Sequence, residues 1–290
     1  MMYNYDRGPT PYTDLAAERR RADLNGDGVE YSKEEVGEFV WERIRITSES
    51  GERAIGRPRG IYNTLNTERS DLLDSNALKA ARDELSKELI GLAGISGARP
   101  ESILVVGLGN KNLTSDSLGC LTCDRVKPTR HIKEYDSALF CELGCSEISV
   151  ITPNVMAKTG LDSVDVVAAV CEKLSPSLII AVDAIATSSF ERLGSTIQIT
   201  DAGICPGSGL FNHDRALNKV TLGTRVIAIG VPTVIDARVL YLDGIGEGRI
   251  TDPSCIPSPS MFVSPKEIDE IVNYSSQIIA ESINMAFGIY

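Results

Sequence analysis

Three short runs of apolar, mostly β-branched residues constrain the fold of this chain more than any other feature of its sequence. The runs cover residues 103–110, 178–182 and 225–230, and glycine or aspartate closes each of them. Uninterrupted apolar strands of this kind are buried on both faces, as in parallel sheets. Helical patterns separate them, for example at 163–174. We therefore expect βαβ units and an α/β fold, a three-layer αβα sandwich with a mostly parallel central sheet.

The segments outside these units have weaker patterns. Residues 41–46 alternate between apolar and polar side chains, which predicts a half-buried strand. Residues 67–92 and 265–286 have apolar side chains at helical spacing and predict two helices. The first ~30 residues are polar and have no sustained apolar period, so we expect a tail or a loosely held arm there.

The composition argues against several classes of protein. The chain has 290 residues, 24% of them charged, and a formal net charge of -11. A negatively charged surface repels phosphate backbones, so we expect no direct nucleic-acid partner. No apolar run reaches the ~18 residues that span a bilayer, and the N-terminus lacks a hydrophobic signal core, so we expect a cytoplasmic protein with no membrane partner. Seven cysteines, an odd number, predict reduced thiols in that compartment.

Two aspartates follow the predicted strands. Asp116 lies in the loop after the first run, and Asp183 directly ends the second. Ligands bind beyond the carboxyl ends of strands in open α/β sheets, so both carboxylates approach the same edge. Two facing carboxylates can share one proton, because like charges a few Å apart cannot both ionise; one is then a base and the other an acid. The alternative is that Asp116 caps a helix and Asp183 only ends a strand.

Other polar and glycine residues follow the same strands. The pair Gly107 and Gly109 resembles the start of a dinucleotide fingerprint, but the third glycine is missing, so we expect no nucleotide. The glycine-rich stretch 201–209 can line a cleft with backbone N–H groups, or it can be an ordinary tight loop. The residues expected to line the site are Asn110, Asn112, Asp201, Gly207, Ser208, Gly209 and Thr233.

Two patterns are typical of metal sites. The first has the spacing of an EF-hand calcium loop and comprises Asp23, Asn25, Asp27, Gly28 and Glu34. Its eighth position is Glu30, where an aliphatic residue usually packs, and no second loop pairs with it, so a solvated acidic turn is the preferred interpretation. The second pattern is a possible four-cysteine zinc site made of Cys120, Cys123, Cys141 and Cys145. Thiols three residues apart on a helix more often pack in the core, and we expect no metal and no cofactor.

Eight ordered blocks of sequence cover nearly the whole chain. They are 12–18 (YTDLAAE), 52–66 (ERAIGRPRGIYNTLN), 104–119 (LVVGLGNKNLTSDSLG), 129–132 (TRHI), 151–163 (ITPNVMAKTGLDS), 179–209 (IIAVDAIATSSFERLGSTIQITDAGICPGSG), 226–237 (VIAIGVPTVIDA) and 260–272 (SMFVSPKEIDEIV). These blocks resemble the spore germination protease family.

The resemblance implies a phosphorylase/hydrolase-like αβα fold related to that of the hydrogenase-maturation proteases. It implies an endopeptidase of the forespore and spore core that initiates degradation of small acid-soluble spore proteins, its substrates and partners. It also implies a homotetramer. The two aspartates that the family uses in catalysis correspond to Asp116 of NLTSDSLG and Asp183 of IIAVDAIA.

The resemblance further implies a zymogen that removes its own N-terminal propeptide. We expect cleavage between Asp14 and Leu15, which divides the chain into a propeptide, 1–14, and a single α/β peptidase domain, 15–290. An acidic residue followed by an apolar one also occurs in the family's protein substrates. Gly8, Pro9 and Pro11 lie in the propeptide, so we expect it to be mobile enough to reach the cleft.

Two other functions compete with this one. The first is a metal-dependent protease, because the related maturation enzymes bind a metal through Glu, Asp and His and Asp183 fits the Asp. The second is a non-catalytic oligomeric binding protein on the same scaffold. Activity in excess chelator separates the metal-dependent protease from the aspartate-dependent one.

Overall fold

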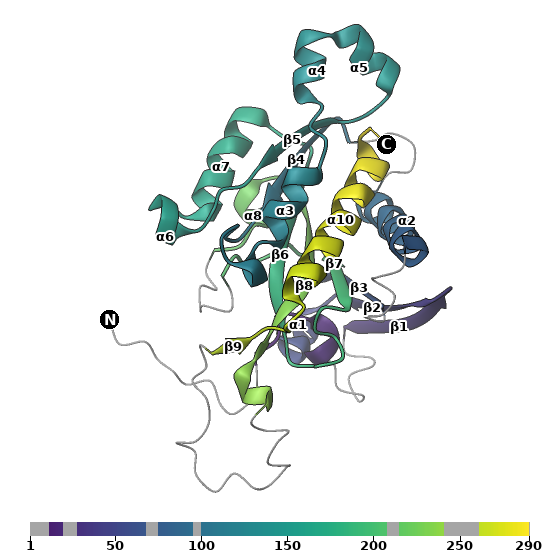
Figure 1. Ribbon diagram of the computed structural model, residues 1–290, viewed down its shortest axis with the longest axis vertical. Coiled ribbons are helices and arrows are strands. Elements are labelled where there is room, and N and C mark those ends of the chain that lie inside the picture. The colour runs from purple at the N-terminus through teal and green to yellow at the C-terminus, as the bar shows by residue number, and fades with distance from the viewer. Residues whose placement is uncertain are drawn as a thin grey trace, which may run out of the picture.

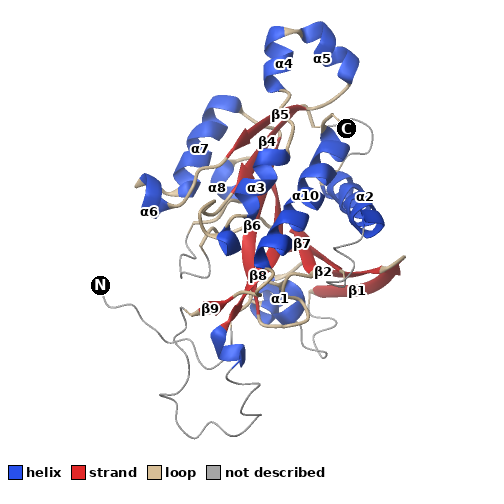
Figure 2. Ribbon diagram, in the orientation of Figure 1, coloured by secondary structure: helices blue, strands red, loops and turns tan. Residues whose placement is uncertain are grey.

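The chain forms a single mixed β-sheet with helices packed on both of its faces (Figures 1 and 2). The computed structural model describes residues 12–19, 28–67, 75–94, 100–207, 215–240 and 261–289. Within those ranges the sheet has nine strands in the order β1-β2-β3-β7-β8-β6-β4-β5, and β9 pairs with β8.

One half of the sheet is parallel and the other half is antiparallel. The parallel strands are β4 (Ser102–Gly107), β5 (Glu147–Ile151), β6 (Leu178–Thr187) and β8 (Arg225–Asp236). The antiparallel strands are β1 (Val29–Val36), β2 (Phe39–Ile46), β3 (Gly60–Asn66), β7 (Thr196–Thr200) and β9 (Phe262–Val263). The carboxyl ends of β4, β6 and β8 therefore meet at one edge, as the apolar runs predict.

Two separate core clusters cover the two faces of the parallel strands. Val105 and Ile180 pack into the cluster that includes side chains of α2 (Ser75–Leu92), α3 (Leu118–Arg125) and α10 (Ile268–Phe287). The neighbouring residues Leu104 and Ile179 point the other way, into a cluster with α7 (Ser163–Leu174). Successive strand residues thus bury opposite faces, which is why these runs are apolar throughout.

The remaining helices are short. They include α1 (Glu49–Ile55), α4 (Arg130–Tyr135), α5 (Ser137–Leu143), α6 (Met156–Thr159) and α8 (Lys219–Leu222), together with the 3-10 turns η1 (Ala16–Arg19) and η3 (Thr114–Asp116). The α4–α5 pair projects beyond the end of β4 and β5 (Figure 1). None of the helices in the described ranges is long and apolar enough to cross a membrane.

The predicted α/β fold is confirmed, with differences in detail. The helix expected from residue 67 is described from Ser75, and the strand expected at 41–46 extends over Phe39–Ile46. The helix expected at 265–286 is α10, which begins at Ile268. The sheet is mixed, because β1, β2, β3 and β7 add an antiparallel half beside β8.

The expectation of a loosely held N-terminal arm is wrong for the parts that the structure describes. Tyr12, Leu15 and Ala16 are buried, and Val29–Val36 form the edge strand β1. The prediction took the polarity of this region as a sign that it is exposed to water. Its polar groups instead form hydrogen bonds with the sheet.

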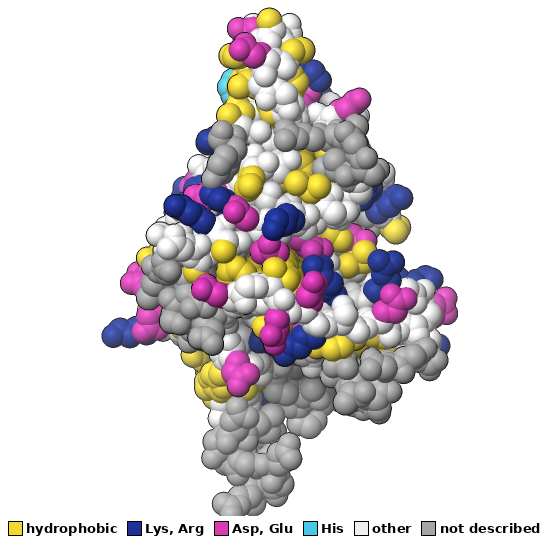
Figure 3. All heavy atoms as spheres, turned by 90° about the vertical axis from the view of Figure 1, so that its right-hand side faces the viewer, with side chains coloured by type: hydrophobic (Ala, Val, Ile, Leu, Met, Phe, Trp, Pro, Cys, Tyr) yellow, Lys and Arg dark blue, Asp and Glu magenta, His cyan; other side chains and the backbone are white. Residues whose placement is uncertain are grey.

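The face on the α2 side is not uniformly acidic. Figure 3 shows the face on the α2 side, where acidic and basic side chains lie interspersed across its middle. The net charge of -11 therefore does not exclude basic side chains from this face.

Candidate active site

Asp183 lies inside strand β6, level with Gly230 of β8. It is 7% exposed, and its Oδ1 accepts a hydrogen bond of 2.9 Å from the N–H of Ala184. Burial raises the pKa of Asp183 well above its ordinary value, and the charges of Asp116 and Asp14 raise it further. This environment favours the protonated form of the Asp183 carboxyl group over the carboxylate.

Asp116 ends the turn η3, which follows β4. The N–H of Asn110 donates to the main-chain oxygen and to Oδ2 of Asp116, both at 2.9 Å. The hydroxyl of Thr233 in β8 donates to the carbonyl of Ser115 at 2.6 Å and ties this loop to the sheet. Burial raises the pKa of Asp116 to about 6, although the hydrogen bond from Asn110 opposes the shift.

Two glycines bring the Asp116 loop close to the strands. Gly109 has a φ of +95°, and a Cβ there would lie 2.1 Å from the main-chain oxygen of Asp116. A Cβ on Gly119, in α3, would lie 2.3 Å from the carbonyl oxygen of Val182, the residue before Asp183. The close approach of α3 to β6 therefore requires glycine at position 119. The pair that resembles a dinucleotide fingerprint has its own cause, because a Cβ on Gly107 would lie 2.2 Å from the carbonyl oxygen of Gly119 and one on Gly109 would meet Asp116.

The two carboxyl groups have different environments. Asp183 is buried in the sheet, whereas Asp116 is half-buried on a loop and keeps a hydrogen-bond donor. Because the charge of Asp116 raises the pKa of Asp183, the pair favours one shared proton over two ionised groups. This arrangement suits general acid–base work on a water molecule and a peptide bond.

The structure brings some of the expected site-lining residues to Asp116 and leaves others apart. Asn110 and Thr233 contact its loop, as described. Asn112 is exposed, and its N–H donates to Oδ1 of Asn110 at 3.1 Å. Asp201 does not lie beside Asp116 and Asp183. It follows β7, in which Thr200 lies level with Ala228, and its Oδ1 accepts a hydrogen bond of 2.7 Å from the N–H of Ile61. Gly207 is exposed, and Ser208 and Gly209 lie outside the described residues.

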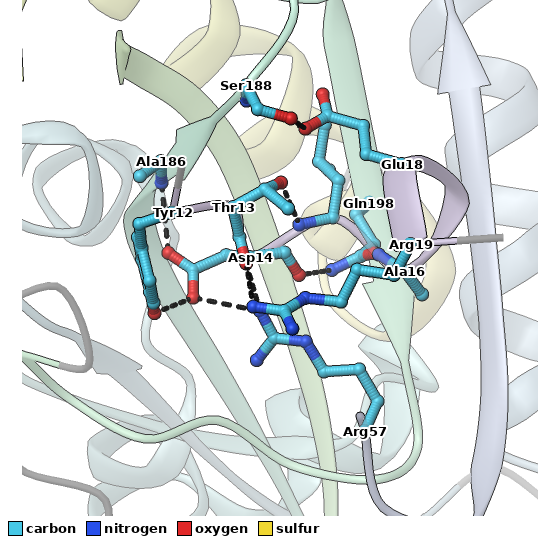
Figure 4. Close-up of polar contacts among 11 residues, drawn as sticks. Tyr12, Thr13, Asp14, Ala16, Glu18, Arg19, Arg57, Ala186, Ser188 and Gln198 are labelled. Atoms are coloured by element: carbon cyan, nitrogen blue, oxygen red, sulfur yellow. Dashed lines mark hydrogen bonds and ion pairs between the residues drawn. The ribbon is translucent and has the colours of Figure 1, made fainter. Parts of the chain in front are cut away.

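The prediction missed an N-terminal segment, residues 12–19, that packs along the end of β6 (Figure 4). The N–H of Asp14 donates to the carbonyl of Ala186 at 2.9 Å, and the N–H of Ala186 donates to Oδ2 of Asp14 at 3.0 Å. Glu18 accepts bonds of 2.7 and 2.6 Å from the N–H and hydroxyl of Ser188. Further anchors are the N–H of Tyr12 to Asp236 at 2.8 Å and the N–H of Ala16 to Gln198 at 2.9 Å.

Arg57 holds this segment from the other side. It follows α1, which ends at Gly56 in the left-handed conformation. Its Nη2 donates to the carbonyl of Thr13 at 2.6 Å and to Oδ1 of Asp14 at 3.2 Å. Burial alone lowers the pKa of Arg57, but the neighbouring charges, Asp14 first, outweigh burial and raise it. Arg57 lies in the block 52–66, and nothing in that block indicates which of its arginines is half-buried.

The two metal patterns do not assemble in the described residues. Glu30 and Glu34 lie in strand β1, which is incompatible with an EF-hand loop leading into a helix; Asp23, Asn25 and Asp27 lie outside the described residues. Cys120 and Cys123 are buried on α3, whereas Cys141 is exposed on α5. Over the described ranges, no three His, Cys, Asp or Glu residues are grouped so that they could hold a metal ion.

Comparisons with known proteins point to one family. A family model described as germination protease matches residues 12–246. The chain is 33% identical to the germination protease of Clostridium acetobutylicum over an alignment of 311 positions, which covers 94% of each chain. It is 39% identical to that of Bacillus licheniformis over 243 residues, covering 80% of this chain and 65% of the other.

One solved structure is also similar. It is the NiFe hydrogenase maturation protease HycI from Thermococcus kodakarensis, with 21% identity and a TM-score of 0.35, covering 67% of this chain and 99% of that one.

Proposed function

The chain belongs to the germination protease family, and we propose that it is the endopeptidase that begins the degradation of small acid-soluble spore proteins. That it is a protease follows from the family. The aspartate mechanism, the substrate and the self-processing are proposals that we argue below.

The proposed mechanism uses Asp116 and Asp183 as a general base and a general acid. The observation that carries it is the placement of the two carboxyl groups, Asp183 inside β6 and Asp116 in the loop after β4, where burial raises the pKa of both. In this mechanism ionised Asp116 accepts a proton from the attacking water, and protonated Asp183 donates one to the leaving amine. Asn110 supports the ionised form of Asp116, because its N–H donates to that carboxylate.

The packing of residues 12–19 supports a zymogen. Asp14 and Leu15, the expected cleavage point, lie against the end of β6, and the charge of Asp14 reaches Asp183. A chain held there blocks the approach of a protein substrate to the same strand. The expected mobility of residues 12–14 is wrong, since Tyr12 and Thr13 are buried. Self-cleavage therefore requires the docked segment to shift or to be cut by another copy.

The test uses purified protein, a small acid-soluble spore protein, and the variants Asp116→Asn and Asp183→Asn. Turnover of each variant is expected to fall by a factor of about 10²–10⁴ while the protein stays folded, because an amide keeps the shape of the side chain but cannot transfer the proton. Wild-type turnover in Asp183→Asn contradicts the mechanism. Loss of the parent's activity in excess chelator favours a metal-dependent protease, and absence of cleavage favours a binding protein.

Three further assignments are proposals on the same basis: removal of residues 1–14, assembly as a homotetramer, and location in the forespore and spore core. N-terminal sequencing after incubation at mildly acidic pH tests the first. A stable start at Met1 together with full peptidase activity excludes the zymogen.

A further inference from the structure

The side chain of Asp14 occupies a site built for a carboxylate. Its Oδ1 accepts from Nη2 of Arg57 at 3.2 Å and from the hydroxyl of Tyr12. Its Oδ2 accepts from the N–H of Ala186 at 3.0 Å. The side chain is 11% exposed, and that of Arg57 is 20% exposed (Figure 4). A carboxylate with three donors, one of them cationic, is held far more specifically than an ordinary surface aspartate.

Two of these three donors belong to the body of the enzyme. Arg57 follows α1, and Ala186 lies in β6, three residues beyond Asp183. Only Tyr12 would leave with residues 1–14. After cleavage between Asp14 and Leu15, Asp14 leaves too, and the guanidinium of Arg57 loses its anion.

Arg57 would then be a cation in a poorly hydrated place. Its Nε is buried and has no hydrogen-bond partner in the structure as described. A buried charge without a counter-ion is costly, so the vacated position favours a new carboxylate. The main chain of Ala186 adds a donor and an acceptor that pair with an extended peptide, as in strand addition.

We infer that Arg57, with the N–H of Ala186, binds the acidic side chain of a protein substrate at the residue preceding the bond that is cut. The inference rests on the proposed function. An acidic residue in the substrate is an expectation from the family; its receptor in this chain is the new element. Asp14 fills this position in the uncleaved chain and is itself the first acidic residue that Arg57 binds.

The test uses processed enzyme and two peptides that copy residues 9–19, one with Asp14 and one with Asn at that position. Asn has the same shape but no charge. The parent is expected to cleave the Asp peptide with a kcat/KM roughly 10- to 100-fold higher, because a charge-assisted hydrogen bond is lost with Asn. Arg57→Gln should lower kcat/KM for the Asp peptide by that factor and leave the Asn peptide within about threefold, so that the preference disappears.

The controls separate a binding role from a structural one. Arg53→Gln, at an exposed arginine of α1, the helix that precedes Arg57, should keep the parent's preference. Arg57→Lys keeps the charge but not the planar fork, and should retain an intermediate preference. If Arg57→Gln does not fold, an intermediate ratio of kcat/KM for the Asp and Asn peptides in Arg57→Lys supports the inference.

The outcomes are distinct. An unchanged Asp-to-Asn ratio in Arg57→Gln or Arg57→Lys overturns the inference and leaves the proposed function intact. An equal loss for both peptides in folded Arg57→Gln also overturns it, because the role is then structural. A parent enzyme that cleaves neither peptide nor a small acid-soluble spore protein overturns the proposed function and the inference together.

Discussion

Replacing Asp116 with Asn should make the folded protein more stable at neutral pH while it removes activity. Burial raises the pKa of Asp116 from 3.8 to about 6, so the folded form binds this proton more tightly than the unfolded form does. Between these two pH values the folded state holds more protons, and the free energy of unfolding therefore falls as pH rises. The decrease in the free energy of unfolding is complete above the pKa of Asp116 in the folded protein, where Asp116 is ionised in both the folded and the unfolded state.

The size of the effect follows from the shift. Two pKa units correspond to about 3 kcal/mol, and partial exposure of Asp116 reduces this to about 1–2 kcal/mol. Asn keeps an oxygen that accepts from the N–H of Asn110, so the substitution removes the buried charge without removing that bond. Gaining stability by losing a catalytic charge is expected where function needs a destabilised group.

The assay is urea unfolding at a fixed protein concentration, at pH 7.5 and pH 4. Both proteins carry Asp183→Asn to prevent self-cleavage, and Asp116→Asn is added to one of them. The double variant should be more stable by about 1–2 kcal/mol at pH 7.5, and the difference should shrink towards zero at pH 4. A difference that is equal at the two pH values, or a less stable double variant at pH 7.5, refutes the reasoning.

Three other predictions follow from the site. Activity of the processed enzyme should fall below about pH 6, where Asp116 becomes protonated, and a pH–rate profile with an acid limb near pH 4 would contradict this. Gly119→Ala should destabilise the fold by at least ~3 kcal/mol in thermal or urea unfolding, since its Cβ would lie 2.3 Å from a carbonyl oxygen of β6. Gly91→Ala in α2, whose Cβ would meet no atom within 4 Å, should instead stabilise the fold by about 0.5–1 kcal/mol. Arg238→Met should cost about 3–5 kcal/mol, because it leaves the fully buried Asp236 without its cation, and a loss below 1 kcal/mol in urea unfolding would show that the pair is dispensable.

The sequence predicted the parts of the fold that depend on local pattern. The apolar runs gave β4, β6 and β8 because strands buried on both faces carry no polar positions, and α7 was predicted at its observed bounds, Ser163–Leu174. The antiparallel half was not predicted as part of the same sheet. Its strands are partly polar, and β7 joins β3 to β8 through pairings between residues far apart in the sequence.

The candidate site was predictable only where residues follow strands. Asp116 and Asp183 were found that way, but Asp201 follows a strand of the opposite direction and therefore lies elsewhere. Arg57 could not be found from composition, because its burial depends on Thr13 and Asp14, which only the folded chain brings to it.

The polar character of residues 12–19 explains both the missed prediction and a property of the segment. The part before the proposed cut is held mainly by hydrogen bonds and one ion pair, those of Asp14 to Ala186 and Arg57 and that of Tyr12 to Asp236. Such bonds exchange for bonds to water when the segment leaves, so their net contribution to stability is about 1 kcal/mol each. Leu15 and Ala16, by contrast, are fully buried and lie after the proposed cut. The division at Asp14 thus removes the residue that bonds to Ala186 of β6 and keeps the buried Leu15 and Ala16 in place, while Tyr12, which is also buried, leaves with the removed part.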